Sequence, residues 1–455
     1  MLDNEKFRID NEFFKKEYIN AYKFVKKMKH STIRDIIACL TDFHANGSYE
    51  IIAQNFKLLD EPDYAYMVRS TDLETQNYET GVKYISENAY NFLSKSKIYG
   101  GELLINKIGI PGKSYLMPKL NKPVSLGMNL FLLKLKPNCG VNEYYLWAFL
   151  NSRIGSNIIK RKINGTMPLS IDKEAIKSLY IPIINIDIQN RIRSLIMESQ
   201  KIFNDSKSLY RQAEELLLEA IGLKDFQPTN KNKSIKTFKE SFLTTGRLDA
   251  EYYQPKYEEI ISKVKQQEYD LLSNLVSIKK SIEPGSEAYS DEGLPFLRVS
   301  DYNKFGISEP EKKLSDNFYN ANRTLINSLK PKKETILFSK DGSAGTAYLL
   351  YEDANFITSG AILHLNIKDK KVLPEYLTLT LNSKVVQQQA EHDAGGSIIL
   401  HWRVDEIKKV VIPIIDIKIQ RKIAELIEKS FKLRTESERL LKEAKEAVEK
   451  EITNC

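Results

Sequence analysis

The sequence predicts an α+β protein with an internal repeat, in which two globules are joined by two long antiparallel coiled-coil helices about a pseudo-twofold axis. Three observations support this fold class. The segment IPIINIDIQNRI at Ile181 returns 231 residues later as IPIIDIKIQRKI at Ile412. Both copies continue into a long stretch in which apolar and small residues recur with heptad spacing. Upstream of both, short β-type runs alternate with short helical patterns and Gly-containing loops.

The repeat covers most of the 455 residues. RIDNEFFKKEY at Arg8 matches RLDAEYYQPKY at Arg247. ELLINKIGIPGKSYLM, which starts at Glu102, resembles ETILFSKDGSAGTAYLL, which starts at Glu334. The ends of the copies agree and their middles diverge, which indicates a duplicated scaffold with individually adapted interiors.

From the repeat we expect five consecutive parts. They are a first globule over 1–184, a first long helix over 185–222, a linker over 223–245, a second globule over 246–415 and a second long helix over 416–455. Asn185 and Asp416 occupy equivalent positions, and both are favourable helix caps. Gly222 favours the end of the first long helix.

Each long helix carries a predicted coiled-coil seam of two positions per heptad. The seam residues are Ile192, Leu195, Ser199, Ile202, Ser206, Leu209, Ala213 and Leu216 in the first helix, and Ile423, Leu426, Ser430, Leu433, Ser437, Leu440, Ala444 and Ala447 in the second. Serines fall at the same two layers in both helices, where small side chains let the backbones approach closely. We expect antiparallel pairing of the two helices; the alternative is a surface helix on the core of each domain.

Composition and charge limit the binding partners and the cellular compartment that we expect for this protein. The 68 Lys and Arg against 60 Asp and Glu give a formal charge of +8, which permits an acidic polymer as partner without requiring one. Three distant cysteines, Cys39, Cys139 and Cys455, argue against a disulfide scaffold and are typical of a reducing cytoplasm. The charged N-terminus is unlike a signal peptide, and no apolar run approaches the roughly 18 residues of a membrane helix. We therefore expect a cytoplasmic protein without a membrane partner.

The chain resembles the specificity subunits of type I restriction–modification systems. The IPI…Q…I segments at Ile181 and Ile412, the long helix after each, the openings at Arg8 and Arg247, and ILFSKDGSAGTA from Ile336 carry the resemblance, which covers essentially the whole chain. It implies two target-recognition domains, each reading one half of a bipartite, asymmetric DNA sequence. It also implies that the coiled coil fixes the gap between the halves and that the chain holds no catalytic residues.

The resemblance implies partners as well. They are double-stranded DNA, two methyltransferase (modification) subunits docked against the helices, and restriction and translocase subunits. S-adenosylmethionine, ATP and Mg²⁺ are expected in those partners, and no cofactor is expected in this chain. In the first copy NKIGIPGKS replaces the family-like FSKDGSAGT, and the sequence leaves open whether that loop makes the same contacts.

Candidate DNA-binding residues lie in turns, glycine-containing loops and basic clusters. They are His44, Asn46, Gly47, Ser48, Tyr49, Arg69, Thr71, Lys113, Lys160, Arg161, Lys162, Gly285, Ser286, Arg298, Ser300, Lys332, Lys333, Ser339, Lys340, Asp341, Ser343 and Thr346. Cationic side chains neutralise phosphates, and polar side chains read base edges. The structural alternatives are a solvated basic face for the lysine clusters, a β-turn at Asn46-Gly47, Arg–Asp pairs at Arg69 and Arg298, and a hairpin turn at Asp341-Gly342.

Signals for chemistry in this chain are weak. IGIPGKS ends like a phosphate-binding loop, but Lys107 stands where the first glycine of that motif belongs. No Asn/Asp-Pro-Pro-aromatic motif of an amino-methyltransferase is present, and the five histidines are scattered. We therefore expect neither a catalytic nor a metal site. Two alternatives from other classes stay open: a tandem-domain protein–protein scaffold without DNA specificity, and a cryptic nuclease, whose carboxylates leave little sequence signature.

Overall fold

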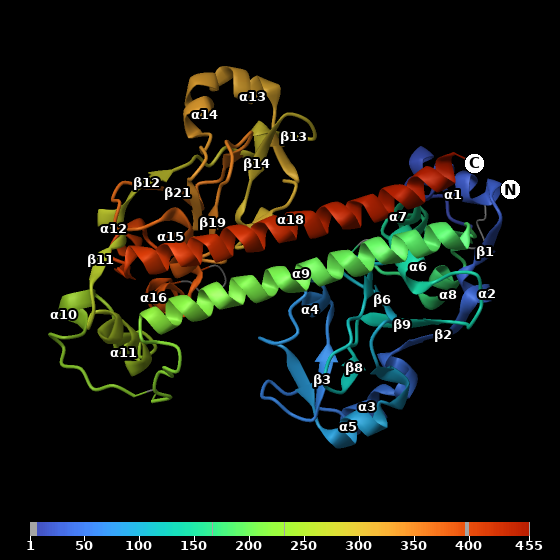
Figure 1. The fold of residues 1–455 in the computed structure, drawn as a ribbon, viewed down its shortest axis with the longest axis horizontal. Helices are drawn as coiled ribbons and strands as arrows, with labels where there is room; N and C mark the ends of the chain where they lie inside the picture. The colour runs from blue at the N-terminus through green and yellow to red at the C-terminus, as the bar shows by residue number, and fades with distance from the viewer. Residues whose placement is uncertain (1–6, 166, 232, 396–399, 455) are drawn as a thin grey trace. The chain divides into compact units, whose positions relative to one another are not determined.

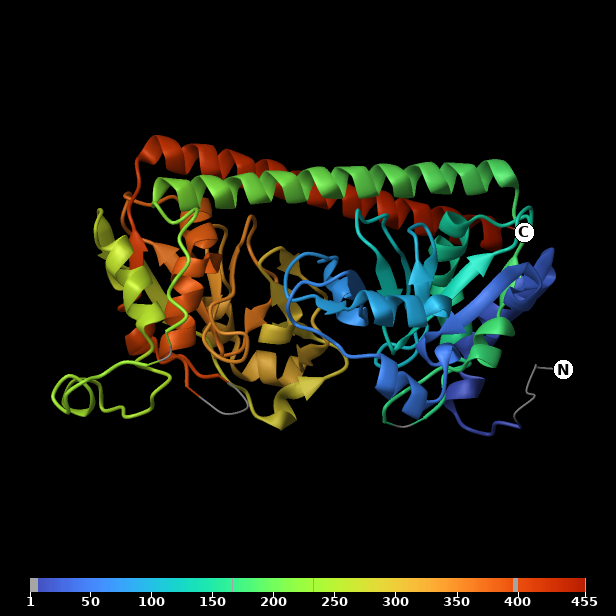
Figure 2. The same ribbon diagram turned by 90° about the horizontal axis from the view of Figure 1, so that it is seen from below.

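The computed structural model of the chain describes residues 7–165, 167–231, 233–395 and 400–454. It divides into two compact units. Unit 1 comprises Met1–Ile202 with Glu436–Cys455, and unit 2 comprises Phe203–Thr435. Each unit holds one α+β globule together with half of each long helix, so the predicted fold class is confirmed (Figures 1 and 2).

The first globule mixes short helices with short strands. Its helices are η1 (Glu12–Phe14), α1 (Lys16–Lys27), α2 (Ile33–Ile36), η2 (Phe43–Asn46), α3 (Tyr49–Asn55), α4 (Ser70–Thr75), α5 (Glu87–Phe92), η3 (Ser94–Ser96), α6 (Glu143–Leu150), α7 (Arg153–Lys160) and α8 (Lys173–Lys177). Its strands are β1 (His30–Thr32), β2 (Ile37–Asp42), β3 (Ala65–Val68), β4 (Lys83–Ile85), β5 (Lys97–Ile98), β6 (Leu103–Asn106), β7 (Ser114–Leu116), β8 (Val124–Leu126), β9 (Leu130–Leu135) and β10 (Tyr180–Pro182). The first long helix, α9, spans Ile186–Ala220.

The second globule follows the same plan. Its helices are α10 (Phe242–Thr245), α11 (Pro255–Val264), α12 (Leu272–Leu275), η4 (Ser286–Ala288), η5 (Val299–Asp301), α13 (Asp316–Ala321), α14 (Arg323–Leu329), α15 (Pro374–Asn382), α16 (Lys384–Asp393) and α17 (Val404–Ile407). Its strands are β11 (Tyr269–Leu271), β12 (Val276–Lys280), β13 (Tyr289–Ser290), β14 (Leu294–Leu297), β15 (Tyr302–Asn303), β16 (Gly306–Ile307), β17 (Lys312–Leu314), β18 (Ile336–Ser339), β19 (Ala347–Leu349), β20 (Ile357–Thr358), β21 (Ile362–Ile367) and β22 (Val411–Pro413). The second long helix, α18, spans Ile417–Thr453.

The sheets repeat between the units. Unit 1 has an antiparallel sheet in the order β2-β9-β6-β7, and unit 2 has β12-β21-β18-β19. A second four-stranded sheet in each unit contains one parallel pair, β3–β8 or β14–β20. The central strands β6 and β18 are buried along their whole length, which explains why LLIN and ILFS run without polar alternation.

The long helices pack against each other through the predicted serine layers. In unit 1 the hydroxyl of Ser199 donates to the carbonyl of Ser437 at 2.9 Å, and Ser437 returns a bond to the carbonyl of Ser199 at 3.0 Å. In unit 2 the hydroxyl of Ser430 donates to the carbonyl of Ser206 at 2.8 Å. Moving along α9 from Ser199 to Ser206 corresponds to moving back along α18 from Ser437 to Ser430. The two helices therefore run antiparallel. A hydroxyl reaching a backbone carbonyl on the facing helix requires the close approach that small seam residues allow.

The buried stripe of each helix is wider than the predicted seam, which is a correction. Ile192, Ser199, Ser206 and Ala213 are buried as expected, and Leu440 and Ala444 are buried in α18. The residues that follow several predicted seam positions are nevertheless more buried than those positions: Ile196, Tyr210, Leu217, Ile427 and Val448 are buried, whereas Leu195, Ile202, Leu209, Leu216, Leu426, Leu433 and Ala447 are only partly buried. The reason is a second contact, because each helix also packs on a globule.

The cores show this second contact directly. The core of unit 1 joins Ile192 and Ile196 of α9 and Ala444, Val448 and Ile452 of α18 to the strands and helices of the first globule. The core of unit 2 joins Tyr210, Ala213 and Leu217 of α9 and Ile423 and Ile427 of α18 to the second globule. The alternative of a surface helix on a domain core is therefore correct in part: each helix contacts both its partner helix and a globule.

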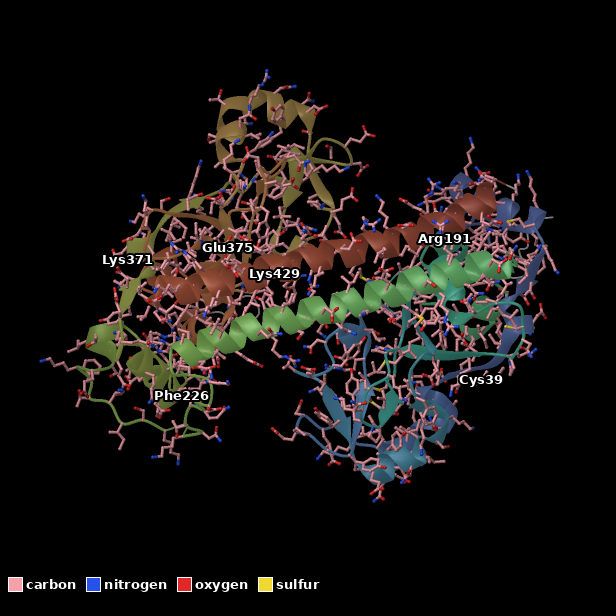
Figure 3. All side chains as sticks on the ribbon, viewed as in Figure 1. Cys39, Arg191, Phe226, Lys371, Glu375 and Lys429 are labelled. Atoms are coloured by element: carbon pink, nitrogen blue, oxygen red, sulfur yellow. The ribbon has the colours of Figure 1, made fainter. Side chains whose placement is uncertain are left out.

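The glutamine of each IPI…Q segment bonds the start of the following long helix to its globule, and this set of bonds is here called the glutamine clamp. Gln189 is fully buried; its side-chain carbonyl accepts from the amide of Asn142 at 3.0 Å, and its Nε2 donates to the carbonyls of Gly140 at 2.8 Å and Ile184 at 3.1 Å. Gln420 makes the same three bonds with Leu373, Lys371 and Ile415 at 2.9, 2.8 and 3.0 Å. Figure 3 labels Lys371 beside the start of α18. The clamp ties each helix to the loop before α6 or α15.

Capping residues set the helix bounds as the sequence predicts. The side chain of Asn185 accepts from the amide of Asp187 at 2.8 Å, and that of Asp416 accepts from Lys418 at 2.7 Å. At the end of α9, Gly222 adopts a φ of 67° and Leu223 donates back to the carbonyl of Leu218 at 2.7 Å. The predicted linker over 223–245 contains the short helix α10 at its end.

Two further observations bear on the class of protein. None of the helices within the described ranges combines the length and hydrophobicity needed to cross a bilayer. Cys39, on β2 (labelled in Figure 3), and Cys139 are free thiols; Cys455 lies outside the described residues.

Candidate nucleic-acid interface

The candidate residues near His44 form a helix start in place of the β-turn that was the alternative. Residues Phe43–Asn46 form η2, and Ser48 caps α3 by accepting from the amide of Ile51 at 3.4 Å. The side chain of Asn46 bonds to the carbonyl of Phe43 and to Ser96, and accepts from the amide of Lys95, all between 2.7 and 2.9 Å. Because both ends of this amide are used inside the protein, the contacts argue against Asn46 as a base reader.

The aromatic residues beside it are more accessible. The ring of His44 lies 4.8 Å from that of Tyr49, and Tyr49 is 77% exposed. Gly47 connects η2 to α3 with an extended backbone. Tyr49 therefore offers a free aromatic face of the kind that stacks on nucleic acid, and its role in DNA binding stays a prediction.

A buried carboxylate connects three segments of the first globule. Asp42, at the end of β2, accepts from Lys107 at 3.0 Å and from Lys173 at 2.9 Å. Burial raises the pKa of Asp42, but the bonds from the two lysines outweigh it and the pKa is lowered overall, so the group is held as a carboxylate. Its observed partners are cations, and within the described part of the chain no cluster suited to a metal ion occurs.

The two glycine loops have the same backbone structure. The first glycine loop is 106–113; the amide of Asn106 donates to Lys113 at 2.9 Å and that of Gly112 to Asn106 at 2.8 Å. The second glycine loop is 339–346; the amide of Ser339 donates to Thr346 at 3.0 Å and that of Gly345 to Ser339 at 2.8 Å. Left-handed glycines occupy matched positions, with φ of 87° and 83° at Gly109 and Gly112 and of 69° and 91° at Gly342 and Gly345. NKIGIPGK and SKDGSAGT are thus the same loop with different side chains.

Each glycine loop lies beside a second loop, here named the flanking loop. In unit 1 the flanking loop is 164–170, closed by paired bonds of 2.9 Å between Asn164 and Ser170, and the amide of Ile171 donates to Lys107 at 3.0 Å. In unit 2 the ends are Gly395 and His401, and the amide of Trp402 donates to Lys340 at 2.8 Å. Thr166 and 396–399 lie outside the described residues. The glycine loop and the flanking loop therefore form one paired surface in each unit.

The side chains of the second glycine loop fall into two groups. Ser339 is fully buried, where it accepts from the amide of Thr346 at 2.9 Å, so this candidate contact residue is corrected to a structural one. Asp341 pairs with both Lys340 and His401, the latter at 2.9 Å. Ser343 is exposed, and its carbonyl accepts from the hydroxyl of Thr346 at 3.0 Å. The loop joins β18 to β19, as expected for a hairpin, and Ser343 is exposed on it, while Asp341 pairs with His401 of the flanking loop.

The basic run Lys160-Arg161-Lys162 does not act as one cluster. Arg161 is 1% exposed; its guanidinium lies 4.0 Å from the ring centroid of Phe13, and its Nε donates to the carbonyl of Phe13 at 3.3 Å. It is therefore a core residue and is withdrawn as a phosphate contact. Lys160 is exposed and Lys162 partly exposed, at the end of α7 beside the flanking loop.

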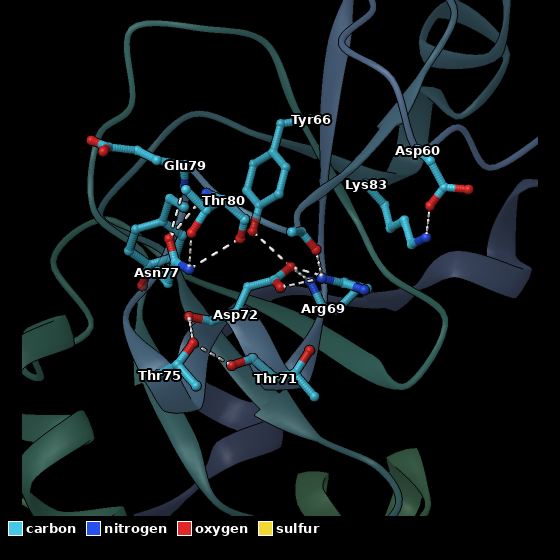
Figure 4. A network of polar contacts seen from close by, with 12 residues as sticks. Asp60, Tyr66, Arg69, Thr71, Asp72, Thr75, Asn77, Glu79, Thr80 and Lys83 are labelled. Atoms are coloured by element: carbon cyan, nitrogen blue, oxygen red, sulfur yellow. Dashed lines mark hydrogen bonds and ion pairs between the residues drawn. The ribbon is translucent and has the colours of Figure 1, made fainter. Parts of the chain in front are cut away.

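Arg69 and Arg298 are engaged in the Arg–Asp pairs that were the structural alternative (Figure 4 shows the first). Arg69 donates to Asp72 through Nη2 at 2.7 Å and Nε at 3.2 Å, and Asp72 also accepts from the buried hydroxyl of Tyr66 at 2.8 Å. Arg298 donates to Asp301 at 3.3 Å and to Glu311 at 3.1 Å. The hydrogen bond to Asp72 raises the pKa of Arg69, so its charge is permanent. These contacts fix the turns after β3 and β14.

Those two turns lie next to the glycine loops. In unit 1 the carboxylate of Glu74 on α4 accepts from Tyr115 at 3.1 Å and from Asn106 at 3.4 Å. In unit 2 the hydroxyl of Tyr302 donates to the carbonyl of Thr346 at 3.1 Å. Thr71 is exposed on α4, whereas Ser300 donates to Asp301 at 3.0 Å.

The remaining candidates lie elsewhere. Lys332 and Lys333 precede β18, at the opposite end of that strand from the second glycine loop, and Lys332 pairs with Asp353 at 3.0 Å. Gly285 and Ser286 start η4, in the turn before β13. Lys113 closes the first glycine loop and is exposed. The structure thus brings Lys113, Lys160 and Lys162 near one paired surface, and Lys340, Asp341, Ser343 and Thr346 near the other.

Comparison with known proteins shows which class of protein this chain is similar to. Residues 271–446 match the family model described as type I restriction modification DNA specificity domain, and this match confirms the resemblance predicted from the sequence. The repeated sheets, clamps and glycine loops give the first half of the chain the same architecture. The match gives no support to a protein–protein scaffold or a nuclease. No curated protein matches the chain in sequence.

Solved structures of similar proteins include two specificity subunits. The S subunit of the type I restriction–modification system of M. genitalium shares 14% identity with a TM-score of 0.41, covering 93% of this chain and 95% of that one. The HsdS subunit of Thermoanaerobacter tengcongensis shares 12% identity with a TM-score of 0.29, covering 93% and 96%. The assignment to the family comes from the match over residues 271–446.

Proposed function

We propose that the chain is the DNA-recognition subunit of a type I restriction–modification complex and that each globule reads one half of a bipartite, asymmetric target. One observation carries the proposal: a family-matched DNA specificity domain occurs in a chain that builds the same paired surface twice, with different side chains on it. The conserved backbone explains how both halves present a reader, and the changed side chains explain why the two halves of the target differ.

The matched positions make the difference concrete. Ile108 of the first glycine loop corresponds to Asp341 of the second, and Ile110 corresponds to Ser343. At the flanking loop Ser170 corresponds to His401. At the two glycine-loop positions, hydrogen-bonding side chains in the second unit are replaced by isoleucine in the first, so identical half-sites are not expected.

The paired helices are proposed to fix the gap between the half-sites and to dock the methyltransferase subunits. α9 has 35 residues, about 52 Å at 1.5 Å per residue, and major-groove positions on one face of DNA recur every ~34 Å. The serine layers and the glutamine clamps hold the helices in one register and tie each to a globule. We propose that this construction keeps the spacer at one length.

The proposal assigns the chemistry to other subunits in the cytoplasm. Methyltransferase subunits would bring S-adenosylmethionine, and restriction and translocase subunits would bring ATP and Mg²⁺. The chain itself would act through binding alone. Support for this division comes from the match of residues 271–446 to a DNA specificity domain.

The test is an exchange of interiors. Met67–Leu169 is replaced with the corresponding interior of a related specificity subunit, and the methylated sites of the assembled complex are mapped. One half of the target should change while the other half and the gap stay. The matched exchange of Phe296–Leu400 should change the opposite half. A change in both halves from one exchange, or in neither from both, would contradict the proposal.

A further inference from the structure

We propose that the first unit recognises thymine through apolar contacts, with Ile108, Ile110 and Met167 packing against thymine 5-methyl groups in the major groove of its half-site. This inference rests on the proposed function and adds the chemistry of one half of it. The surface concerned is the paired surface of unit 1, which consists of the first glycine loop and its flanking loop.

The two loops bring these side chains to one place. Ile108 and Ser170 lie opposite each other in a backbone bridge, and the amide of Ile171 donates to the carbonyl of Lys107 at 3.0 Å. The flanking loop is closed on itself between Asn164 and Ser170. Met167 therefore lies in a short loop whose base is paired to the part of the first glycine loop that carries Ile108 and leads to Ile110.

These residues are exposed although they are large and apolar. Ile108 is 37% exposed, Ile110 53%, Leu169 44% and Met167 93%. A single exposed apolar side chain is ordinary, but four in two paired loops form a patch, and such patches mark binding surfaces. The left-handed Gly109 and Gly112 hold the turn that presents Ile110, so the patch belongs to a defined loop conformation.

The second unit supplies the comparison that assigns a chemistry. On the same backbone it places Asp341 for Ile108, Ser343 for Ile110 and His401 for Ser170. Asp341 and Ser343 can hydrogen-bond to base edges, whereas the isoleucines at the same positions of the first glycine loop cannot. In the major groove the only methyl group on the edge of an unmodified base is the 5-methyl group of thymine. A reader surface built from Ile and Met is therefore complementary to thymine.

Positive charge around the patch indicates a polyanion as occupant. Lys113 ends the first glycine loop and Lys160 ends α7, and both are exposed. A Cβ added to Gly112 would overlap the side chain of Ile159, so the loop packs directly against the last turn of the helix that carries Lys160. Burial and the neighbouring charge of Lys113 lower the pKa of Lys445, as expected where cations gather. An apolar patch bordered by lysines fits DNA, with phosphates at the rim and methyl groups at the centre.

The experiment compares thymine with deoxyuridine, which lacks only the methyl group. The complex of the chain with its methyltransferase subunits is titrated with target duplexes that carry deoxyuridine in the first half-site, in the second, or in neither. Loss of one buried methyl group is worth roughly fourfold in affinity, so Kd should rise about fourfold for each methyl contacted in the first half. The variant I108S/I110S/M167S should bind the thymine and the deoxyuridine versions of the first half-site equally. Ile235→Ser, at a fully exposed isoleucine outside the patch, is the matched control and should behave like wild type.

Three results would overturn the inference. They are an unchanged Kd on first-half deoxyuridine substitution, a first half-site without thymine in either strand, and a variant that keeps the preference for thymine. If deoxyuridine left Kd unchanged but the variant I108S/I110S/M167S bound more weakly, the patch would be assigned to a wedge between base steps or to a protein contact. If wild type did not distinguish its target from a scrambled duplex, the proposed function would fail as well, which is a separate and recognisable result.

Discussion

Replacement of Gln189 by leucine should detach the start of α9 from the first globule. The substitution keeps the size of the side chain and removes three buried hydrogen bonds, leaving the amide of Asn142 and the carbonyls of Gly140 and Ile184 without their partner. At about 1 kcal/mol for each bond, the local free energy of opening should fall by about 3 kcal/mol, a factor of roughly 100 in the opening equilibrium.

The assay is hydrogen exchange followed by mass spectrometry on residues 140–150 and 180–190. In Gln189→Leu these segments should exchange about a hundredfold faster, while 371–382 and 411–421 of the second unit stay protected by Gln420. Gln420→Leu should give the reverse pattern. Gln200→Leu, an exposed glutamine on the same helix, is the control and should change little. Equal protection in Gln189→Leu and Gln200→Leu would refute the clamp.

Three further predictions concern the helix pair, a buried histidine and a glycine loop. Ser199→Leu places a large side chain in the layer where Ser199 and Ser437 are hydrogen-bonded, and it should lower the free energy of unfolding by roughly 1–3 kcal/mol, measured by thermal melting. Ser194→Leu, at an exposed position of the same helix, should leave the melting temperature unchanged. Burial lowers the pKa of His364 to about 4, so below pH 6.5 this histidine is protonated in the unfolded chain but stays neutral in the folded chain. The free energy of unfolding should therefore fall by up to about 3 kcal/mol towards pH 4. His364→Asn should remove this contribution, measured by urea unfolding at different pH values. In Gly112→Ala the new Cβ would sit at a φ of 83° and overlap the side chain of Ile159, so the variant should be less stable by ~1–3 kcal/mol. Gly109→Ala, where a Cβ would contact no neighbouring atom, should lose less stability. Equal melting temperatures of the two variants would contradict the packing of the loop on Ile159.

Much of the fold is predictable from the sequence because the repeat constrains it twice. Asn185, Asp416 and Gly222 mark helix bounds through local hydrogen bonding, which depends on few neighbours. The serine layers follow from the heptad spacing. The burial of the second seam position in each heptad is less well predicted. Heptad spacing indicates only which residues face the partner helix, whereas Ile196, Tyr210 and Val448 are buried because they also face a globule.

The candidate site shows the same limit. Arg161 and Ser339 have the residue types of DNA contacts, but their burial is decided by residues distant in the sequence, such as Phe13 for Arg161. Asn46 is similarly engaged by Ser96 and Lys95. The exposed Ile108, Ile110 and Met167 were missed because apolar residues are assigned to a core by default. For Ile108 and Ile110 the signal available was their alignment with the polar loop SKDGSAGT of the second copy.

The central claim is that one chain carries two different readers at a fixed separation. Selection from a randomised duplex library by the chain assembled with its methyltransferase subunits tests it most directly. We expect the enriched sequences to show two short, dissimilar motifs with a constant number of unspecified base pairs between them. A single continuous motif, two identical motifs, or a gap of variable length would contradict the account.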